Sequence, residues 1–472
     1  MQLSVFLLFI TLAGPVLACA DLPPADAAAL GLAQAQARVA DCHPDVRAAR
    51  AALGAALADV QVAGQLPNPQ LTVGAGSVGT SLGSGPWWRK TYDQSVRLDQ
   101  LLERGNKPAL RRAVADATRL AVLADLADAQ RRASSAVARS HQDLWALQGR
   151  QAQLQAAVAG STESLRLLDA RVRAGDAPAL DATRFRLDDA RLRADLRQAD
   201  ADRQDLQRQL AVLIGAGPVA AQLQALAAAL PAAAPAGLRQ AEPAASPALA
   251  HPNTDNRPDV AAAQARVSAA ELARDLAAAA RTRDVNIGLQ FDHWPTSPTN
   301  GSGTGNTISL SVSVPLFIRH ANEGELARAQ ADLASAQDGL RRLRDGASAE
   351  LARTAAQARG AQDRRQLVIQ QLEPAAEQVA AGAELAYRRG ASTALELLDA
   401  RRSLRAVRLE RINVDADLAK ALADWQAAAS TAGGPSAAGG PSAAGGQSTA
   451  GGQSTAGGQS AAGTPAPTLQ TP

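Results

Sequence analysis

The sequence predicts a mainly helical protein that also contributes strands to a membrane β-barrel, with the whole pattern present twice. Three observations lead to this fold class. Short segments alternate between apolar and polar residues, long segments rich in Ala, Leu and Arg carry helical spacing, and both kinds recur about 214 residues later. Because side chains alternate between the two faces of a strand, each short segment predicts a strand with one apolar and one polar face.

Four strands are expected, in two hairpins that cover about 70–102 and about 285–316. The clearest segment, 308–315, reads Ile-Ser-Leu-Ser-Val-Ser-Val-Pro. Within it Ile308, Leu310 and Val312 share one face, and three serines share the other. Aromatic residues near the strand ends suit either anchors at a lipid–water interface or local packing; they are Trp87, Trp88, Tyr92 and Trp294.

The helical segments are too long for an ordinary globular domain. Residues 105–173 contain one proline, near their start, and an unbroken helix of that length would extend about 100 Å. A turn near 174–179 and a further helical segment to 214 complete a helical hairpin, and the second repeat has its turn near 390–394. Pro374 interrupts the second long helix and predicts a kink there. An Ala-rich helix over 30–66 precedes the first β-hairpin.

These elements divide the chain into five parts. Residues 1–20 predict a signal peptide, 21–214 the first repeat, 215–256 a Pro- and Ala-rich connector, 257–428 the second repeat, and 429–472 a disordered tail rich in Gly, Ser and Ala. Cleavage after Ala20 and a lipoprotein-type cleavage before Cys19 both fit, so Cys19 is a candidate lipidation site. Cys42 is then either unpaired or, with Cys19 unlipidated, its disulfide partner.

Composition excludes several classes of protein. Only 3% of the 472 residues are aromatic, too few for conventional large cores. The formal net charge is +3 and no basic block stands out, which argues against nucleic acid as a partner. After the signal, no run of 18 or more apolar residues offers a transmembrane helix, so a membrane-inserted part would consist of strands.

One chain cannot close a barrel from four strands. The smallest single-chain membrane barrels have about eight strands, and no strand edge stays open in lipid. Three identical chains would supply twelve strands, an even number that is compatible with antiparallel closure. The long helices follow directly on the strands and would continue such a barrel as a helical tube.

Several motifs make the chain resemble the TolC-type outer-membrane efflux proteins over about 30–425. They are the paired segments His43-Pro44-Asp45-Val46 and Arg257-Pro258-Asp259-Val260, the paired hairpins, Gln100-Leu101-Leu102-Glu103 with Gly105 and Lys107, Val314-Pro315-Leu316-Phe317, Leu372-Glu373-Pro374, Tyr387-Arg388-Arg389-Gly390, and Leu395-Glu396-Leu397-Leu398-Asp399-Ala400. The stretch 100–107 looks most like the heavy-metal cation efflux branch of the family, which holds the CzcC-like proteins.

The resemblance implies a homotrimer in the bacterial outer membrane, with a twelve-stranded β-barrel in the lipid and a twelve-helix barrel in the periplasm. The expected partners are a periplasmic adaptor of the membrane fusion protein class, an inner-membrane pump of the RND type, and outer-membrane lipid. The expected function is the channel of a tripartite efflux system for heavy-metal cations. Drug efflux and type I protein secretion are alternatives. A periplasmic coiled-coil adaptor or structural interaction protein is the rival from another class, although an adaptor would have one helical hairpin.

By the same resemblance, the helical turns form the periplasmic tip that meets the adaptor. Its turn residues are Gly175, Gly390 and Ser392. Ser392 stands where relatives have Arg, so their salt-bridge latch does not carry over. Tyr387 occupies the position at which family members close the tip through hydrogen bonds between neighbouring helices.

Three carboxylates lie just beyond these turns. Asp181 and Glu396 each stand six residues after a turn glycine, and Asp399 shares a helical face with Glu396. In a trimer, each inward carboxylate would form a ring of three negative charges that attracts cations. The resemblance therefore points to Asp181, Glu396 and Asp399 as carboxylates of the pore aperture.

No catalytic chemistry is expected. The five histidines are scattered without metal-ligand spacing, and neither a Gly-rich phosphate loop nor a nucleophile motif occurs. A carrier of soft metals would need a cluster of Cys, His and Met, and the single Met is residue 1. The sequence predicts a channel with no enzyme activity, no cofactor and no resident metal.

Overall fold

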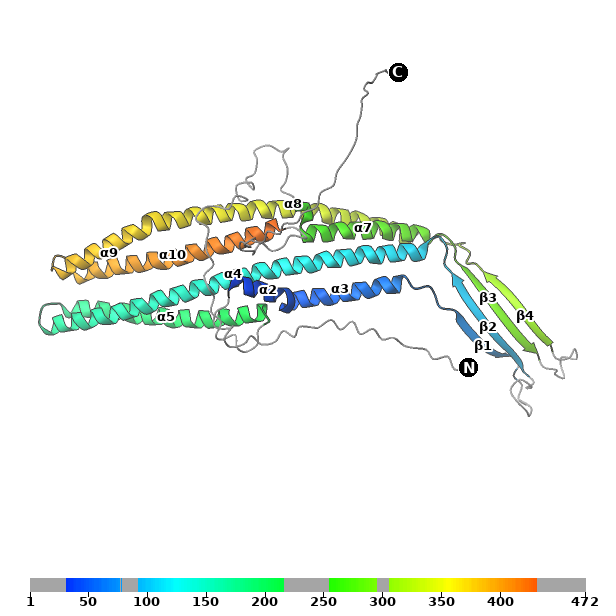
Figure 1. Ribbon diagram of the computed structural model, residues 1–472, viewed down its shortest axis with the longest axis horizontal. Helices are drawn as coiled ribbons and strands as arrows, with labels where there is room; N and C mark the ends of the chain where they lie inside the picture. The colour runs from blue at the N-terminus through cyan, green and yellow to red at the C-terminus, as the bar shows by residue number, and fades with distance from the viewer. Residues whose placement is uncertain (1–30, 77, 79–91, 216–253, 295–304, 431–472) are drawn as a thin grey trace, which may run out of the picture. The chain divides into compact units, whose positions relative to one another are not determined.

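The computed structural model describes residues 31–76, 78, 92–215, 254–294 and 305–430 (Figure 1). The predicted signal peptide, Cys19, most of the connector, Trp87, Trp88 and nearly all of the tail lie outside these residues. Cys42 is buried and is not a free thiol.

The two repeats contain the same kinds of element in the same order. The first comprises α2 (Leu32–Cys42), α3 (Pro44–Ala63), β1 (Gln70–Gly76), β2 (Asp93–Leu102), α4 (Lys107–Arg173) and α5 (Ala179–Leu213). The second comprises η3 (Thr254–Asn256), α7 (Pro258–Ala279), β3 (Val285–Trp294), β4 (Gly305–Ser313), α8 (Glu323–Leu367), η4 (Val368–Leu372), α9 (Glu373–Arg388) and α10 (Ala394–Ala429).

The Ala-rich segment before β1 forms two helices rather than the single helix expected over 30–66. The break falls at His43, whose φ of −61° and ψ of 133° are extended. Pro44 causes it, because a proline disfavours the helical conformation of the residue before it. His43 then caps α3, since its Nδ1 accepts a hydrogen bond of 3.1 Å from the Asp45 amide.

The kink expected at Pro374 takes the form of a π-helical turn, η4. Pro374 has no amide hydrogen to donate to the carbonyl four residues earlier, and its ring would clash with that carbonyl. Instead the Glu373 amide donates to the Val368 carbonyl five residues back. In the first repeat Ala159 stands at the position that matches Pro374, counted from the turn glycines, and α4 continues unbroken.

Helix α4 joins the helical elements of both repeats. It packs along α3 and α5 of its own repeat and along α7 and α10 of the other, while α8 packs on α7 and α10. Many of the buried residues along these contacts are alanines, which allow close helix packing in a chain with few aromatic residues. Several small hydrophobic clusters replace one large core, and the first surrounds Val137, Leu144 and Leu210. None of the helices in the described ranges is long and apolar enough to cross a membrane.

Arginines cap the returning helices of both repeats. At the end of α5, the Arg38 guanidinium donates to the Ile214 and Gly215 carbonyls at 3.0 and 3.2 Å. At the end of α10, the Arg131 Nη1 donates to the Ala427 carbonyl at 3.1 Å. A positive charge at these ends also complements the negative end of the helix dipole.

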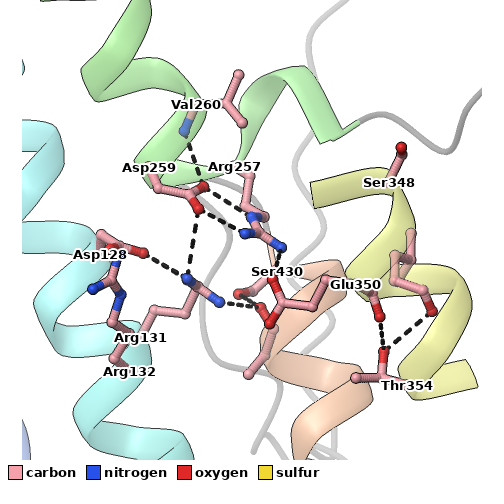
Figure 2. A network of polar contacts seen from close by, with 12 residues as sticks. Asp128, Arg131, Arg132, Arg257, Asp259, Val260, Ser348, Glu350, Thr354 and Ser430 are labelled. Atoms are coloured by element: carbon pink, nitrogen blue, oxygen red, sulfur yellow. Dashed lines mark hydrogen bonds and ion pairs between the residues drawn. The ribbon is translucent and has the colours of Figure 1, made fainter. Parts of the chain in front are cut away.

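A buried ion-pair network holds the start of α7 against α4 and α8 (Figure 2). Arg257 is 5% exposed, and its Nε and Nη2 donate to the Asp259 carboxylate at 2.8 and 2.6 Å. Its Nη1 lies 2.8 Å from the Glu350 carboxylate on α8. On α4, Arg131 pairs with Asp128 at 2.7 Å and approaches Asp259 to 3.9 Å. Burial alone would raise the pKa of Asp259, but the Arg257 hydrogen bonds and both guanidinium charges hold that pKa below its usual value.

The four strands form one antiparallel sheet in the order β1-β2-β3-β4, so the pairing of β2 with β3 joins the two repeats. Within the hairpins, Val73 pairs with Val96 and Leu289 pairs with Leu310. With a constant offset of 214 between the repeats, the pair Val73 and Val96 would correspond to a pair of residues 287 and 310. Residue 310 pairs with Leu289 instead, so the offset is not constant. It is 216 at the end of the second hairpin, where Asn322 corresponds to Asn106, and a shift of two residues keeps every strand side chain on its face.

Candidate functional site

One face of the sheet is apolar and exposed. Across the four strands Leu71, Leu98, Leu289 and Leu310 lie side by side, 64%, 46%, 51% and 72% exposed. A second row follows; its members are Val73, Val96, Phe291 and Ile308. An exposed apolar patch of this kind marks contact with a membrane or with another protein.

The opposite face of the sheet is mostly polar. Its central residues are Thr72, Arg97, Asp99, Gln290, Ser309 and Ser311. Arg97 and Asp99 form a two-pronged ion pair on β2, with N–O distances of 2.7 and 2.8 Å. The sheet therefore has one apolar face and one polar face.

Both outer strands have an unpaired edge among the strands that the structure describes, since β1 pairs only with β2 and β4 only with β3. The free amide and carbonyl groups of such an edge need hydrogen-bond partners, above all next to lipid. The sheet is thus open to pairing with further strands on both sides.

The motif 100–107 builds the junction between β2 and α4. The Lys107 ammonium donates to the Thr282 carbonyl and to the Asp284 carboxylate, both at 2.8 Å. Burial would raise the pKa of Asp284, but the Lys107 hydrogen bond and the Arg104 amide hold it below its usual value. Glu103 pairs with Arg111 of α4 at 2.7 Å. These residues fix the direction in which α4 leaves the sheet.

The two helical turns share one backbone motif. Gly175 and Gly390 have φ values of 81° and 74°, in the left-handed region that glycine adopts without strain. The residue after each glycine donates its amide to the carbonyl five residues back, at 2.9 Å in the first turn and 2.8 Å in the second. This pattern is a Schellman C-cap. The Ser392 hydroxyl lies 3.5 Å from the Ala383 carbonyl, at the limit of a hydrogen bond.

Each predicted aperture carboxylate has its own local partner. Asp181 pairs with Arg184 one turn along α5 at 3.4 Å, and Asp399 pairs with Arg402 at 3.6 Å. Glu396 belongs to a capping box, in which its carboxylate accepts from the Thr393 amide at 3.2 Å. The structure shows no contact among the three carboxylates in the described residues of this one chain.

Tyr387 joins the two helical hairpins through its ring. The Arg171 guanidinium of α4 lies 5.2 Å from the ring centroid, a cation–π contact. The ring also packs against a cluster from both hairpins, which includes Leu168, Phe185 and Leu398. Within this chain, Tyr387 therefore contacts the other helical hairpin through an arginine over its aromatic face.

Sequence reasoning missed Asp188, which ties α5 to α10. Its carboxylate is 5% exposed and lies 2.8 Å from Arg402 and 3.6 Å from Arg405. A signal was present, because Asp188 falls three residues after Phe185 and four before Leu192, on the apolar face of α5. A carboxylate on a buried face requires cationic partners.

The described residues contain no group of three or more His, Cys, Asp or Glu side chains that could hold a metal ion.

Comparisons with known proteins agree with this architecture. The model of a family described as outer membrane efflux protein matches residues 27–216 and 251–430. Among solved structures, CusC gives a TM-score of 0.69 at 18% identity, over 85% of this chain and 92% of that one. The Vibrio cholerae outer membrane protein VceC gives 0.66 at 20%, over 85% and 96%. The Campylobacter jejuni outer membrane channel CmeC gives 0.69 at 13%, over 84% and 85%. No curated protein sequence matches.

Proposed function

Since the chain belongs to the outer membrane efflux protein family, we propose that it forms the outer-membrane channel of a tripartite efflux system. In this proposal three chains close a twelve-stranded barrel, their helices form a barrel in the periplasm, and a periplasmic adaptor joins the tip to an inner-membrane pump of the RND type. The observation that carries the proposal is the four-stranded sheet with one apolar face, one polar face and two unpaired edges.

The sheet needs other copies in order to be stable in lipid. An open edge next to hydrocarbon leaves amides and carbonyls without partners, at a cost of several kcal/mol for each group. Pairing β1 of one chain with β4 of the next removes every open edge and turns the apolar face outward. The alternatives, a periplasmic adaptor or a structural helical bundle, do not account for an exposed apolar sheet face with two open edges.

Adjacent residues on opposite faces of β3 test the orientation. Leu289→Arg places a charge on the apolar face, which in lipid costs about 2–4 kcal/mol per chain near the bilayer centre. Gln290→Arg places the same charge on the polar face and is the matched control. We expect the Leu289 variant to be lost from the outer-membrane fraction and the Gln290 variant to remain there as a trimer, as measured by light scattering in mild detergent. Equal recovery of both variants, or a monomeric wild type, would contradict the proposal.

We propose heavy-metal cations as the cargo, on the strength of the stretch 100–107. Its contacts within the chain, such as that of Lys107 with Asp284, serve the strand–helix junction, so the support is the sequence likeness alone. Drug efflux and type I protein secretion remain the alternatives. A deletion strain that loses tolerance to metal salts, with unchanged drug tolerance and protein secretion, supports heavy-metal cations as the cargo. Loss of drug tolerance or of protein secretion, with unchanged metal tolerance, supports the corresponding alternative instead.

We further propose that Asp181, Glu396 and Asp399 surround the aperture. Glu396→Gln removes the charge and keeps the capping box, which accepts Gln as well as Glu. Thr393→Ala is the matched control, because it weakens the cap and keeps the charge. Block of the channel by multivalent cations should weaken in Glu396→Gln and Asp399→Asn and persist in Thr393→Ala. Unchanged block in all variants would place these carboxylates away from the aperture.

The closed tip, in this proposal, is held by the ring of Tyr387 and by the Asp188 ion pairs, while the turns at Gly175, Gly390 and Ser392 contact the adaptor. Tyr387→Phe keeps the ring under Arg171 and should leave conductance unchanged, whereas Tyr387→Ala should raise it. A raised conductance in Tyr387→Phe would show that the latch is a hydrogen bond of the phenol hydroxyl.

A further inference from the structure

A set of polar contacts crosses the middle of the sheet on its polar face. The Arg97 guanidinium on β2 is bound by Asp99 through two hydrogen bonds of 2.7 and 2.8 Å, and it also donates to the Ser311 hydroxyl on β4 at 3.4 Å. The Asn286 amide on β3 donates to Asp99 at 3.3 Å. Ser311 in turn donates to the Gly288 carbonyl at 3.3 Å. Three strands thus hold a single ion pair.

Gly288 provides the space that this ion pair occupies. A Cβ atom at position 288 would lie 2.6 Å from both the Asp99 Oδ1 and the Ser311 Oγ, and 3.0 Å from the Arg97 Nη2. Real Cβ atoms essentially never lie within 3.0 Å of a non-bonded atom, so a side chain at position 288 would displace the Asp99 carboxylate and the Ser311 hydroxyl from these positions. The guanidinium therefore lies against β3, where Asp99 neutralises its charge at close range.

We propose that Arg97 is a determinant of ion selectivity in the barrel lumen and that Asp99 is the residue that positions and neutralises it. The inference rests on the proposed function, in which the polar face lines the lumen. In a trimer the three Arg97–Asp99 pairs form a neutral ring at mid-sheet. The other charged residues on this face of the described strands are Asp93 and Asp292, which leave the lumen acidic. Without Asp99, three uncompensated guanidinium groups would oppose the passage of cations.

Single-channel recording in planar bilayers under a potassium chloride gradient tests the inference. Asp99→Asn should lower the ratio of potassium to chloride permeability by about threefold or more, because three unit charges act within a Debye length of the ion path. Arg97→Gln should raise the ratio, since it leaves Asp99 unpaired. The double variant Arg97→Gln with Asp99→Asn restores a neutral ring and should return the ratio to the wild-type value.

Two further variants separate charge from shape. Arg97→Lys keeps the charge but cannot make the two-pronged contact, so selectivity should stay cationic even where conductance changes. Gly288→Ala keeps every charge and pushes the pair off β3, so conductance should fall without reversal of selectivity. Should Asp99→Asn fail to assemble, Arg97→Gln still tests the inference, because an unchanged permeability ratio in that variant overturns it.

The outcomes distinguish this inference from the proposed function. A protein that gives no channels, even when Tyr387→Ala opens the tip, overturns both, because the polar face then lines no lumen. Wild-type channels with equal permeability ratios in Asp99→Asn, Arg97→Gln and the double variant overturn the role of Arg97 and leave the channel assignment intact. Opposite shifts in the two single variants that cancel in the double variant support it.

Discussion

Replacing Arg257 with methionine should destabilise the helical part of the protein by about 3 kcal/mol. Truncating one partner of a buried ion pair typically costs about 3–5 kcal/mol, because the other charge stays buried without compensation. Two features of the structure favour the lower end of that range. Arg131 lies 3.9 Å from the Asp259 carboxylate that would be left behind. The Glu350 side chain is 38% exposed, so water can solvate its charge once Arg257 is gone.

A double variant separates the charge effect from lost packing. Arg257→Met combined with Asp259→Leu removes both buried charges and should recover about 2 kcal/mol of the loss, since an apolar pair of similar volume often replaces a buried ion pair at little cost. Arg50→Met is the matched control. Arg50 pairs with Asp41 at 3.0 Å, but both side chains are about half exposed, so its loss should cost no more than about 1 kcal/mol.

The assay is guanidinium chloride unfolding of the detergent-purified protein, followed by helical circular dichroism. The midpoint concentration of guanidinium chloride should be highest for the wild type, followed by Arg50→Met and the double variant, and lowest for Arg257→Met. An Arg257→Met midpoint equal to that of Arg50→Met would show that the network contributes no more than a surface pair. A double variant as unstable as Arg257→Met would assign the loss to packing instead of charge.

Four further expectations follow from described residues. The depressed pKa of Asp259 contributes stability that is present above the unfolded-state pKa of about 3.9 and is lost as pH falls through the lower folded-state value, so acid unfolding should lose part of its pH dependence in Asp259→Asn. Leu144→Ala, at a fully buried position, should lower the free energy of unfolding by about 2–5 kcal/mol in the same denaturation assay. Gly175→Ala and Gly390→Ala should each cost about 1 kcal/mol through backbone strain alone, because no atom lies within 4 Å of the added Cβ; a larger loss would indicate a contact. Truncation after Ser430 should leave the proposed trimer intact in light scattering, and a monomeric product from a trimeric full-length protein would contradict the expectation that the tail is dispensable.

Sequence patterns predicted the local structure of each segment, but they did not predict which segments pair with one another. Period-two alternation gave the strands and their faces, because it depends on each strand alone. The pairing of β2 with β3 joins segments from different repeats, and no local pattern specifies it. The two-residue change in repeat offset was invisible for the same reason, since a shift of two preserves the alternation.

The backbone of the predicted turns could be derived from the sequence more fully than the partners of the side chains around them. The turn glycines follow from the breakers between two helical segments, and their left-handed backbone is a local property. The ion pairs are different, because 48 basic and 45 acidic residues offer many combinations along neighbouring helices. Only packing decides that Asp188 meets Arg402, whereas the capping box of Thr393 and Glu396 follows from their spacing of three residues. The break between the two helices at His43 could have been predicted from the sequence, since Pro44 disfavours a helical backbone at the residue before it.

The two helical turns have the same backbone but begin their return helices differently. The helix after Gly175 starts at Pro178 without a side-chain cap, and the helix after Gly390 starts with the Thr393 capping box. A ring built from identical half-length chains would present one turn at every position, and any mutation would alter all of them together. Encoding both turns in one gene lets each evolve alone. In the proposed ring of three chains, selection can then refine alternate positions for different contacts, which would give the proposed adaptor a rotational register to recognise.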